Sequence, residues 1–515
     1  MSSASARYSA GNWRGFPKGA WLIVGVEFWE HFSLYGMLAI LALFLTGNPT
    51  RGGFGWSDGN ALTLVGIYSG ALYAFPALGG YFADRILGRR RAVTIGAALM
   101  LVGQVLMVSP VFIPSFLGAW HGASLLHALH ELNVPLGYIV RPQAVSAAIA
   151  ARGALLDSER GADWLSLAYL GSAFGLYTAI GCLVLGNALL KPAMVVLCGD
   201  TFEAGNTRRQ GAYAYFYFAI ALSGLLAGVV VGSVAASFGW HYGFTVAAVG
   251  MAIGLGMYWV LGPRLLGDLG MTRDGPRAAG GDGAAPSAAL DEPTNESRQT
   301  GTRLLLLAVL ALLLCVFCAG WSQMFGTWSL FIERSVDRSI DAFVVPVPWF
   351  VSWNSLVVIA FAPAVTALWA RLGASKQAVD IVQKYAFALA TVAAGHFLMY
   401  WGAARALTGE ATPVWVPMLA LALTAVGELV AWASTYDMVY RVAPPGFGSV
   451  TMGAWYLMTL GLGGYLSGVP GTWVEVLGYG RTFLLLGLLM TAGMIAALLM
   501  RGYLRGLATR VGITL

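Results

Sequence analysis

The sequence predicts an all-α integral membrane fold in which twelve transmembrane helices form two six-helix bundles. Three observations predict it: charge is scarce, apolar segments recur at membrane-spanning length, and one polar linker divides them. Only 10% of the 515 residues are charged and 58% are hydrophobic, whereas an average soluble chain has about 25% charged residues. Lipid, rather than water, must therefore surround most of the chain.

The apolar segments set the number of helices. A bilayer core of about 30 Å needs about 20 apolar residues per helix. We place twelve such segments at approximately 20–46, 61–82, 92–113, 165–192, 213–238, 241–262, 303–331, 349–370, 384–403, 413–440, 448–470 and 481–503.

The basic residues orient these helices. Lys and Arg gather in alternate connections, namely at Arg85, Arg89, Arg90, Arg91, Arg208, Arg209, Arg371, Lys376 and Lys384. The positive-inside rule places these connections, and both termini, in the cytoplasm. We expect a multi-pass protein of the bacterial cytoplasmic (inner) membrane. The net charge of +6 then reflects topology, and no basic run predicts a nucleic-acid partner.

A polar linker near the middle of the chain defines its organisation. Residues 263–302 are rich in Gly, Ala, Pro and polar residues, a composition typical of flexible segments. The predicted units are an N-terminal cytoplasmic segment 1–19, a first bundle 20–262, the linker 263–302, a second bundle 303–503 and a cytoplasmic tail 504–515. A division into six and six spans is that of the major facilitator architecture.

An insertion at 114–164 interrupts the first bundle on the extracytoplasmic side. It contains helix-prone stretches that could lie on the membrane, cap the bundle or bind a partner protein. His121, His127 and His130 raise a metal site, but without a clear carboxylate or Cys partner we favour ordinary polar-face histidines and predict no metal. No nucleophile–base set or phosphate loop predicts an enzyme.

The stretch EFWEHFSLYG carries ionisable residues inside the first apolar segment. Glu27, Glu30 and His31 project from one helix face because they lie three and four residues apart. Ionisable residues at membrane depth face a partner, a water-filled path or a relay. We interpret the cluster as a proton-coupling device; a static polar contact between helices is the alternative.

Several stretches together resemble the proton-coupled oligopeptide transporter (POT, or PTR) family. EFWEHFSLYG resembles its ExxERFxYYG signature, and PALGGYFADRILGRRR resembles its loop between spans two and three. GNALLKPAMVVLCGD and YFYFAIALSG resemble its fourth and fifth helices, and similar stretches continue through spans seven, eight and eleven. The resemblance implies a major facilitator fold that works by alternating access.

The resemblance also implies roles for particular residues. It places Lys191 and Glu428 in a central cavity, one from each half, as an ion pair that a substrate carboxylate or a proton would open; a structural ion pair is the alternative. Substrate contacts are implied for Tyr35, Tyr73, Asn354 and Trp455, each of which could instead be a packing residue. Cytoplasmic gating is implied for Asp84 and Arg85, with topology signalling as the alternative.

The chain departs from the family pattern at several charged positions. The signature arginine is His31, its first tyrosine is Leu34, and a second first-helix arginine is Leu38. In the seventh helix Ser322 replaces a glutamate, and in the fifth Ala221 replaces an asparagine. Joint loss of an arginine and its glutamate partner leaves no stranded charge. It favours a substrate with fewer negative groups, or a modified peptide.

Three functions follow from these observations. The leading hypothesis is a proton-coupled symporter of di- and tripeptides or peptide-like compounds, with Glu27, Glu30, His31 and Glu428 handling protons and with no cofactor. The alternatives are a diverged transporter of a non-peptide solute and a non-transporting membrane subunit.

Overall fold

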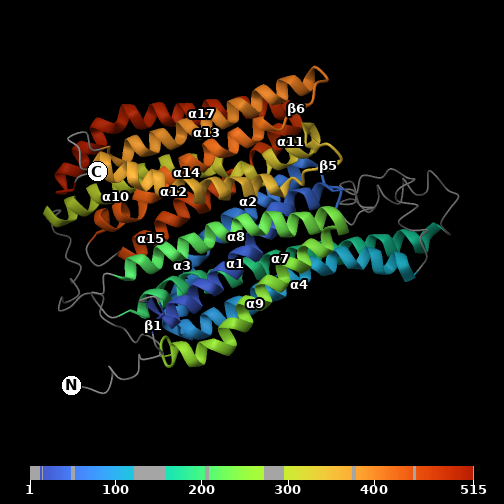
Figure 1. The fold of residues 1–515 in the computed structure, drawn as a ribbon, viewed down its shortest axis with the longest axis horizontal. Helices are drawn as coiled ribbons and strands as arrows, with labels where there is room; N and C mark the ends of the chain where they lie inside the picture. The colour runs from blue at the N-terminus through green and yellow to red at the C-terminus, as the bar shows by residue number, and fades with distance from the viewer. Residues whose placement is uncertain are drawn as a thin grey trace.

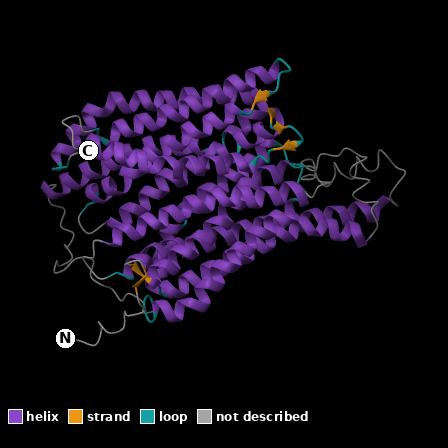
Figure 2. Ribbon diagram, viewed as in Figure 1, coloured by secondary structure: helices purple, strands orange, loops and turns teal. Residues whose placement is uncertain are grey.

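The computed structural model describes residues 12–13, 16–47, 53–120, 158–202, 208–271, 295–373, 379–444 and 448–513. Long helices make up almost all of this structure (Figure 2). The first half contains α1 (Lys18–Thr46), α2 (Asp58–Ala74), α3 (Pro76–Phe82), the π-helical turn η3 (Ala83–Leu87), α4 (Arg89–Trp120), α7 (Ser158–Asp200), α8 (Arg208–Phe238) and α9 (Trp240–Leu266). The antiparallel strands β1 (Asn12–Trp13) and β2 (Phe16–Pro17) precede α1.

The second half repeats the helical design. It contains α10 (Asn295–Trp321), the 3-10 turn η5 (Ser322–Phe325), α11 (Thr327–Ser335), α12 (Pro348–Gly373), α13 (Ile381–Leu407), α14 (Trp415–Val442), α15 (Gly448–Tyr456), the π-helical turn η6 (Leu457–Gly461), α16 (Leu462–Leu466) and α17 (Pro470–Arg510). The short strands β3 (Val336–Asp337) and β6 (Thr412–Pro413) pair in parallel, and β4 (Ser339–Ile340) and β5 (Phe343–Val344) pair in antiparallel.

The predicted spans agree with these helices, with one interruption. Eleven helices of the described residues are long and apolar enough to cross a membrane. The remaining predicted span, 448–470, falls on α15, η6 and α16, where a π-helical turn breaks the regular helix. The second span is also divided, because Pro76 begins α3 and proline lacks the N–H that a continuous helix needs.

Several limits differ from those expected from the sequence. Helix α4 runs on to Trp120 and α7 begins at Ser158, so both ends of the predicted insertion 114–164 belong to these helices. Figure 1 shows α4 and α7 extending together beyond the other helices. The rest of the insertion, including its three histidines, lies outside the described residues.

Helical structure extends into the segments predicted as linker and tail. Helix α9 ends at Leu266, inside the predicted linker, and α10 begins at Asn295. Helix α17 continues to Arg510, so the predicted tail is largely helical. Near its end, Arg501 and Arg505 each place Nε close to Asp380 Oδ2, at 2.8 and 2.7 Å, which ties α17 to the start of α13.

The two halves lie one above the other (Figure 1). They meet closely along α2, where glycines allow backbones to touch. A methyl group at Gly66 would lie 2.6 Å from the Cα of Gly468, and one at Gly70 would lie 2.8 Å from the carbonyl oxygen of Gly461. Small residues are the usual means of close helix approach in membranes.

A second glycine contact joins α8 to α12. A methyl group at Gly228 would meet Ser352 Oγ and would lie 2.5 Å from the carbonyl oxygen of Pro348. A methyl group at Gly224 would lie 2.7 Å from Ser355 Oγ. This contact involves the second half of α8 and the first part of α12, whereas the first contact involves the middle and later part of α2. Of the two, the contact of α8 with α12 lies nearer the end of the bundle at which α8 ends and α12 begins.

Candidate functional site

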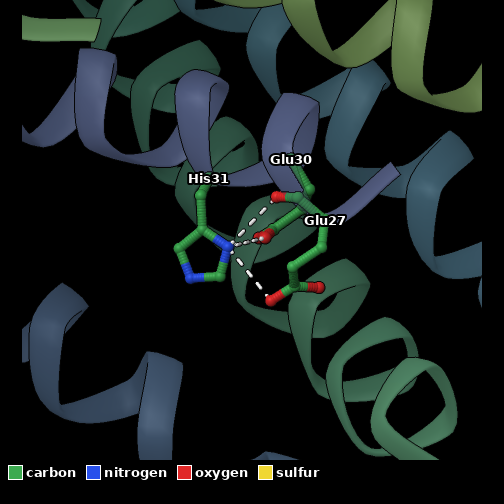
Figure 3. A group of neighbouring side chains, drawn as sticks. All are labelled: Glu27, Glu30 and His31. Carbon is green, nitrogen blue, oxygen red and sulfur yellow. Dashed lines mark hydrogen bonds and ion pairs between the residues drawn. The ribbon is translucent and has the colours of Figure 1, made fainter. Parts of the chain in front are cut away.

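Four charged or titratable side chains form a compact cluster between α1 and α7. Lys191 Nζ lies 2.9 Å from Glu27 Oε1, 2.5 Å from Glu30 Oε2 and 3.0 Å from His31 Nδ1. The same His31 nitrogen lies 3.1 Å from Glu27 Oε1 and 3.0 Å from Glu30 Oε2. Figure 3 shows the three α1 side chains converging. We call these four residues the charged cluster.

Helix geometry explains the cluster. Positions three and four apart bring the α1 residues onto one face. Lys191 precedes Pro192, which lies inside α7 and cannot donate the backbone hydrogen bond to Ala188. At that carbonyl α7 is closely approached by Gly79 of α3, where a methyl group would clash. This packing fixes the part of α7 from which Lys191 reaches α1.

The charged cluster is buried, and only some of its polar atoms form hydrogen bonds. The Glu27 and Glu30 side chains are 1% and 0% exposed, and that of Lys191 is 19% exposed. Lys191 donates hydrogen bonds to both carboxylates and also contacts the His31 ring. By contrast, Glu27 Oε2 and Glu30 Oε1 have no hydrogen-bond partner among the described residues. The cluster therefore retains buried acceptors, which are favourable positions for a proton or a cation.

These residues also have donor atoms of the kinds that bind metals. One ligand atom from each of Glu27, Glu30 and His31 lies within 4.8 Å of the others. The Lys191 ammonium, however, stands within hydrogen-bond distance of all three. Because it already supplies the positive charge between them, the arrangement fits an ion cluster better than a metal centre.

The predicted ion pair between Lys191 and Glu428 is not formed, so that prediction is wrong for this conformation. Lys191 contacts the two carboxylates of its own half. Glu428, on α14, instead accepts a hydrogen bond from Trp321 Nε1 at 2.9 Å. Two carboxylates within 3 Å hold the ammonium more strongly than one on the other half could.

A row of aromatic rings connects the charged cluster to Glu428. The His31 and Tyr35 ring centroids lie 5.3 Å apart, and Tyr35 stacks on Phe325 at 6.2 Å. Phe325 in turn packs edge-on against Trp321 at 5.8 Å. We call His31, Tyr35, Phe325 and Trp321 the aromatic bridge. Sequence reasoning missed Phe325 and Trp321, although they flank the position of the lost seventh-helix glutamate.

The other residues predicted to bind substrate are dispersed. Tyr73 is half-buried on α2 and within electrostatic range of Lys191 and Glu30. Asn354 donates to the carbonyl oxygen of Leu421 at 3.3 Å, which joins α12 to α14. Trp455, on α15, is buried and its indole N–H has no partner among the described residues. Their roles in binding stay predictions.

The predicted gating residues lie within the first half. Asp84 accepts a hydrogen bond from Arg89 at 2.9 Å, and Arg89 also bonds to Asp200 at 2.7 Å. Arg85 lies over the Tyr81 ring, 5.8 Å from its centroid. These contacts join η3, α4 and α7, which all belong to one half, so the structure does not show them crossing between halves.

A polar contact that does cross between halves was missed from the sequence. Arg334 of α11 forms an ion pair with Asp58 at the start of α2, and Tyr479 of α17 donates to Asp58 at 2.6 Å. Nearby, the Gly59 N–H donates to Glu475 Oε1 at 2.8 Å. We call Asp58, Arg334, Tyr479 and Glu475 the latch. Isolated charges near span ends were its only sequence signal.

Comparison with known proteins identifies the family of this chain. The model of the POT family matches residues 90–265 and 291–478. The chain belongs to the POT family. It is 25% identical to the peptide transporter YePEPT of Yersinia enterocolitica, over 87% of this chain and 86% of that protein. It is 23% identical to dipeptide and tripeptide permease A of Edwardsiella piscicida, over 86% of this chain and 83% of that protein.

Solved POT structures have the same fold. The peptide transporter POT in complex with sulfate superimposes with a TM-score of 0.77 at 20% identity, covering 98% of this chain and 99% of that chain. A POT family transporter in complex with 5-aminolevulinic acid gives a TM-score of 0.73 at 18% identity, covering 96% and 98%. The major facilitator fold is thus confirmed. This POT protein is a multi-pass membrane protein of a transporter family, not an enzyme.

Proposed function

We propose that this POT protein is a proton-coupled symporter of di- and tripeptides or peptide-like compounds. The observation that carries the proposal is the buried charged cluster, in which two carboxylates, an imidazole and an ammonium share one site. Relatives named as peptide transporters and permeases support the substrate class. Protons serve as the coupling ion, and no cofactor is required.

Proton handling follows from the unpaired acceptors. A proton on Glu27 Oε2 or Glu30 Oε1 neutralises one carboxylate and weakens its hold on Lys191. The ammonium then gains freedom to move or to engage another group. His31 contacts both carboxylates and titrates near neutrality when unperturbed. Protonation of His31 or of a carboxylate therefore changes the net charge of the cluster.

Alternating access requires the two halves to separate at one end at a time. The latch joins the halves at the start of α2, the end opposite the arginine-rich connection that follows η3. We propose a bacterial cytoplasmic membrane protein with both termini cytoplasmic. The positive-inside rule supports this orientation, and it makes the latch an outer gate. The start of α1 and the end of α17 lie at the same end in Figure 1.

Proteoliposomes with an imposed inward proton gradient test the proposal. We expect uptake of some members of a panel of di- and tripeptides and their C-terminal amides, and loss of gradient-driven uptake in Glu30→Gln. Glu410→Gln is the matched control, because Glu410 is an exposed acid that pairs with Arg405 on the surface. Absence of gradient-driven uptake across the whole panel would contradict the proposal.

Transport of a diverged, non-peptide solute is the second candidate. The observation that favours it is the neutral character of two buried positions where the family has charges, Leu38 and Ser322, which are 5% and 8% exposed. Thermal stabilisation by members of a metabolite library, with none by peptides, would support it. A partner protein bound through 114–164 stays a prediction.

A further inference from the structure

The charged cluster has spare acceptors but engaged donors. Lys191 Nζ donates to Glu30 at 2.5 Å and to Glu27 at 2.9 Å, and it lies 3.0 Å from His31 Nδ1, which also faces both carboxylates. The unpaired atoms are carboxylate oxygens, Glu27 Oε2 and Glu30 Oε1, on side chains that are 1% and 0% exposed. A ligand that donates hydrogen bonds therefore finds partners, and one that only accepts them does not.

The charge balance points in the same direction. The predicted site contains three carboxylates, those of Glu27, Glu30 and Glu428, against one permanent cation, Lys191. His31 adds at most one further positive charge. The site is thus negative unless it binds a proton or a cation. Glu428 uses one oxygen for Trp321, and the structure gives its other oxygen no partner among the described residues.

We infer that this transporter selects substrates that carry a protonated amine and lack a free carboxylate, such as peptide amides. The inference rests on the proposed function and names the substrate class of the same site. The amino group binds a carboxylate, with Glu428 as the accessible one. While Glu27 and Glu30 are both ionised, a substrate carboxylate would have to compete with them for Lys191, and displacing either would leave a buried carboxylate without its counter-charge.

One neutral donor near the charged cluster suits such a substrate. The Tyr68 hydroxyl is buried without a partner among the described residues and lies within electrostatic range of Glu30. This group is neutral. Neutral donors satisfy an amide carbonyl well, whereas binding a carboxylate calls for charged donors such as the arginine fork.

Binding of three matched probes tests the inference. Purified full-length protein is titrated at pH 7 with alanyl-alanine, alanyl-alanine amide and N-acetyl-alanyl-alanine amide, and Kd is measured by calorimetry. These probes differ in the amine and the carboxylate alone. We expect the dipeptide amide to bind at least about ten-fold more tightly than either other probe. Equal or tighter binding of the free dipeptide or the acetylated amide would overturn the inference, as would absence of binding by all three.

A charge variant gives an independent check. His31→Arg places a permanent cation beside Glu27 and Glu30, so the preference for the amide over the free dipeptide should fall by about ten-fold. Glu410→Gln should leave the preference unchanged, and an unchanged preference in His31→Arg would contradict the reasoning. The ratio of the Kd values for the free dipeptide and the dipeptide amide in the unaltered protein tests the inference even if the variant folds poorly.

The two proposals fail in different ways. Binding is measured without a proton gradient, so it reports the substrate class alone. Gradient-driven uptake of free dipeptides, with no preference for amides, would support the proposed function and overturn the inference. Uptake of amides that does not depend on the proton gradient would support the inference and contradict the proposed function.

Discussion

Substitution of Gly228 by alanine should shift this transporter away from the conformation described here. Gly228 lies on α8 where it meets α12. A methyl group there would lie 2.5 Å from the carbonyl oxygen of Pro348 and would also meet Ser352 Oγ. The serine side chain can rotate away, but the proline carbonyl belongs to the backbone. Relief therefore requires the two helices to separate.

The magnitude follows from the geometry. Ordinary contact begins near 3.4 Å, so the helices must separate by about 0.9 Å, or strain must be stored. Overpacking of this kind costs about 1–3 kcal/mol. Alanine also favours a helix over glycine by about 1 kcal/mol, but equally in every conformation. The cost of overpacking falls on the conformation in which α8 and α12 are in contact. The population of that conformation, relative to the one in which the two helices are apart, should therefore fall by about 5- to 150-fold.

Distance measurements between spin labels check this prediction. Phe238→Cys and Ile340→Cys place labels on exposed positions of the two halves, with the half-buried Cys182 changed to serine. Gly228→Ala should broaden the distribution toward longer distances and slow uptake. Gly256→Ala is the control, because a methyl group there meets nothing within 4 Å. Matching distributions in the two variants would refute the reasoning.

Three further predictions concern charged residues. Lys191→Ala leaves two buried carboxylates without their cation, so uptake should be abolished, and flux assays with expression controls check it. His31→Arg should shift the pH profile of uptake, because an imidazole beside Glu27, Glu30 and Lys191 becomes a permanent charge; an identical profile would make His31 a packing residue. For Asp380, burial raises the pKa, but hydrogen bonds and charges from α17 lower it more, so its pKa lies below the ordinary value. The ionised Asp380 carboxylate therefore stabilises the fold above about pH 4, and this stabilisation is lost as the pH falls further. Asp380→Asn should lower Tm at pH 7 and much less near pH 3. Equal losses of Tm at both pH values would exclude the ionic explanation.

The helical framework could be predicted because its cause is local. Each span needs about 20 apolar residues, and the sequence contains them in twelve places. The interruptions were harder to foresee. Pro76 gave a signal for the break after α2, but the π-helical turn Leu457–Gly461 contains residues that any apolar helix would accept. Its position depends on neighbours such as α2, which sequence periodicity does not contain.

The site was partly predictable for the same reason. Glu27, Glu30 and His31 share one helix face by spacing alone, and the structure brings them together. The partner of Lys191 was predicted wrongly, because a choice between carboxylates on different helices depends on tertiary distances. The latch was missed because Asp58 and Arg334 stand 276 positions apart in the sequence and resemble ordinary charges at helix ends.

The distribution of charges also bears on how the halves can move. In the middle of the bundle, Lys191 is paired within its own half, and contact with the other half passes through the uncharged rings of Tyr35 and Phe325. Among the described residues, no buried ion pair breaks when the halves separate there; breaking one would cost about 3–5 kcal/mol if a charge were left unpaired. In the part of the chain that the structure describes, the ion pair that does cross, between Arg334 and Asp58, lies at the end of the bundle, where the two side chains are 44% and 10% exposed. Water can solvate both partners when that end opens, so neither charge is left buried without a partner. Leu38 and Ser322 are uncharged and 5% and 8% exposed, so no ion pair between these two positions has to break when the halves separate.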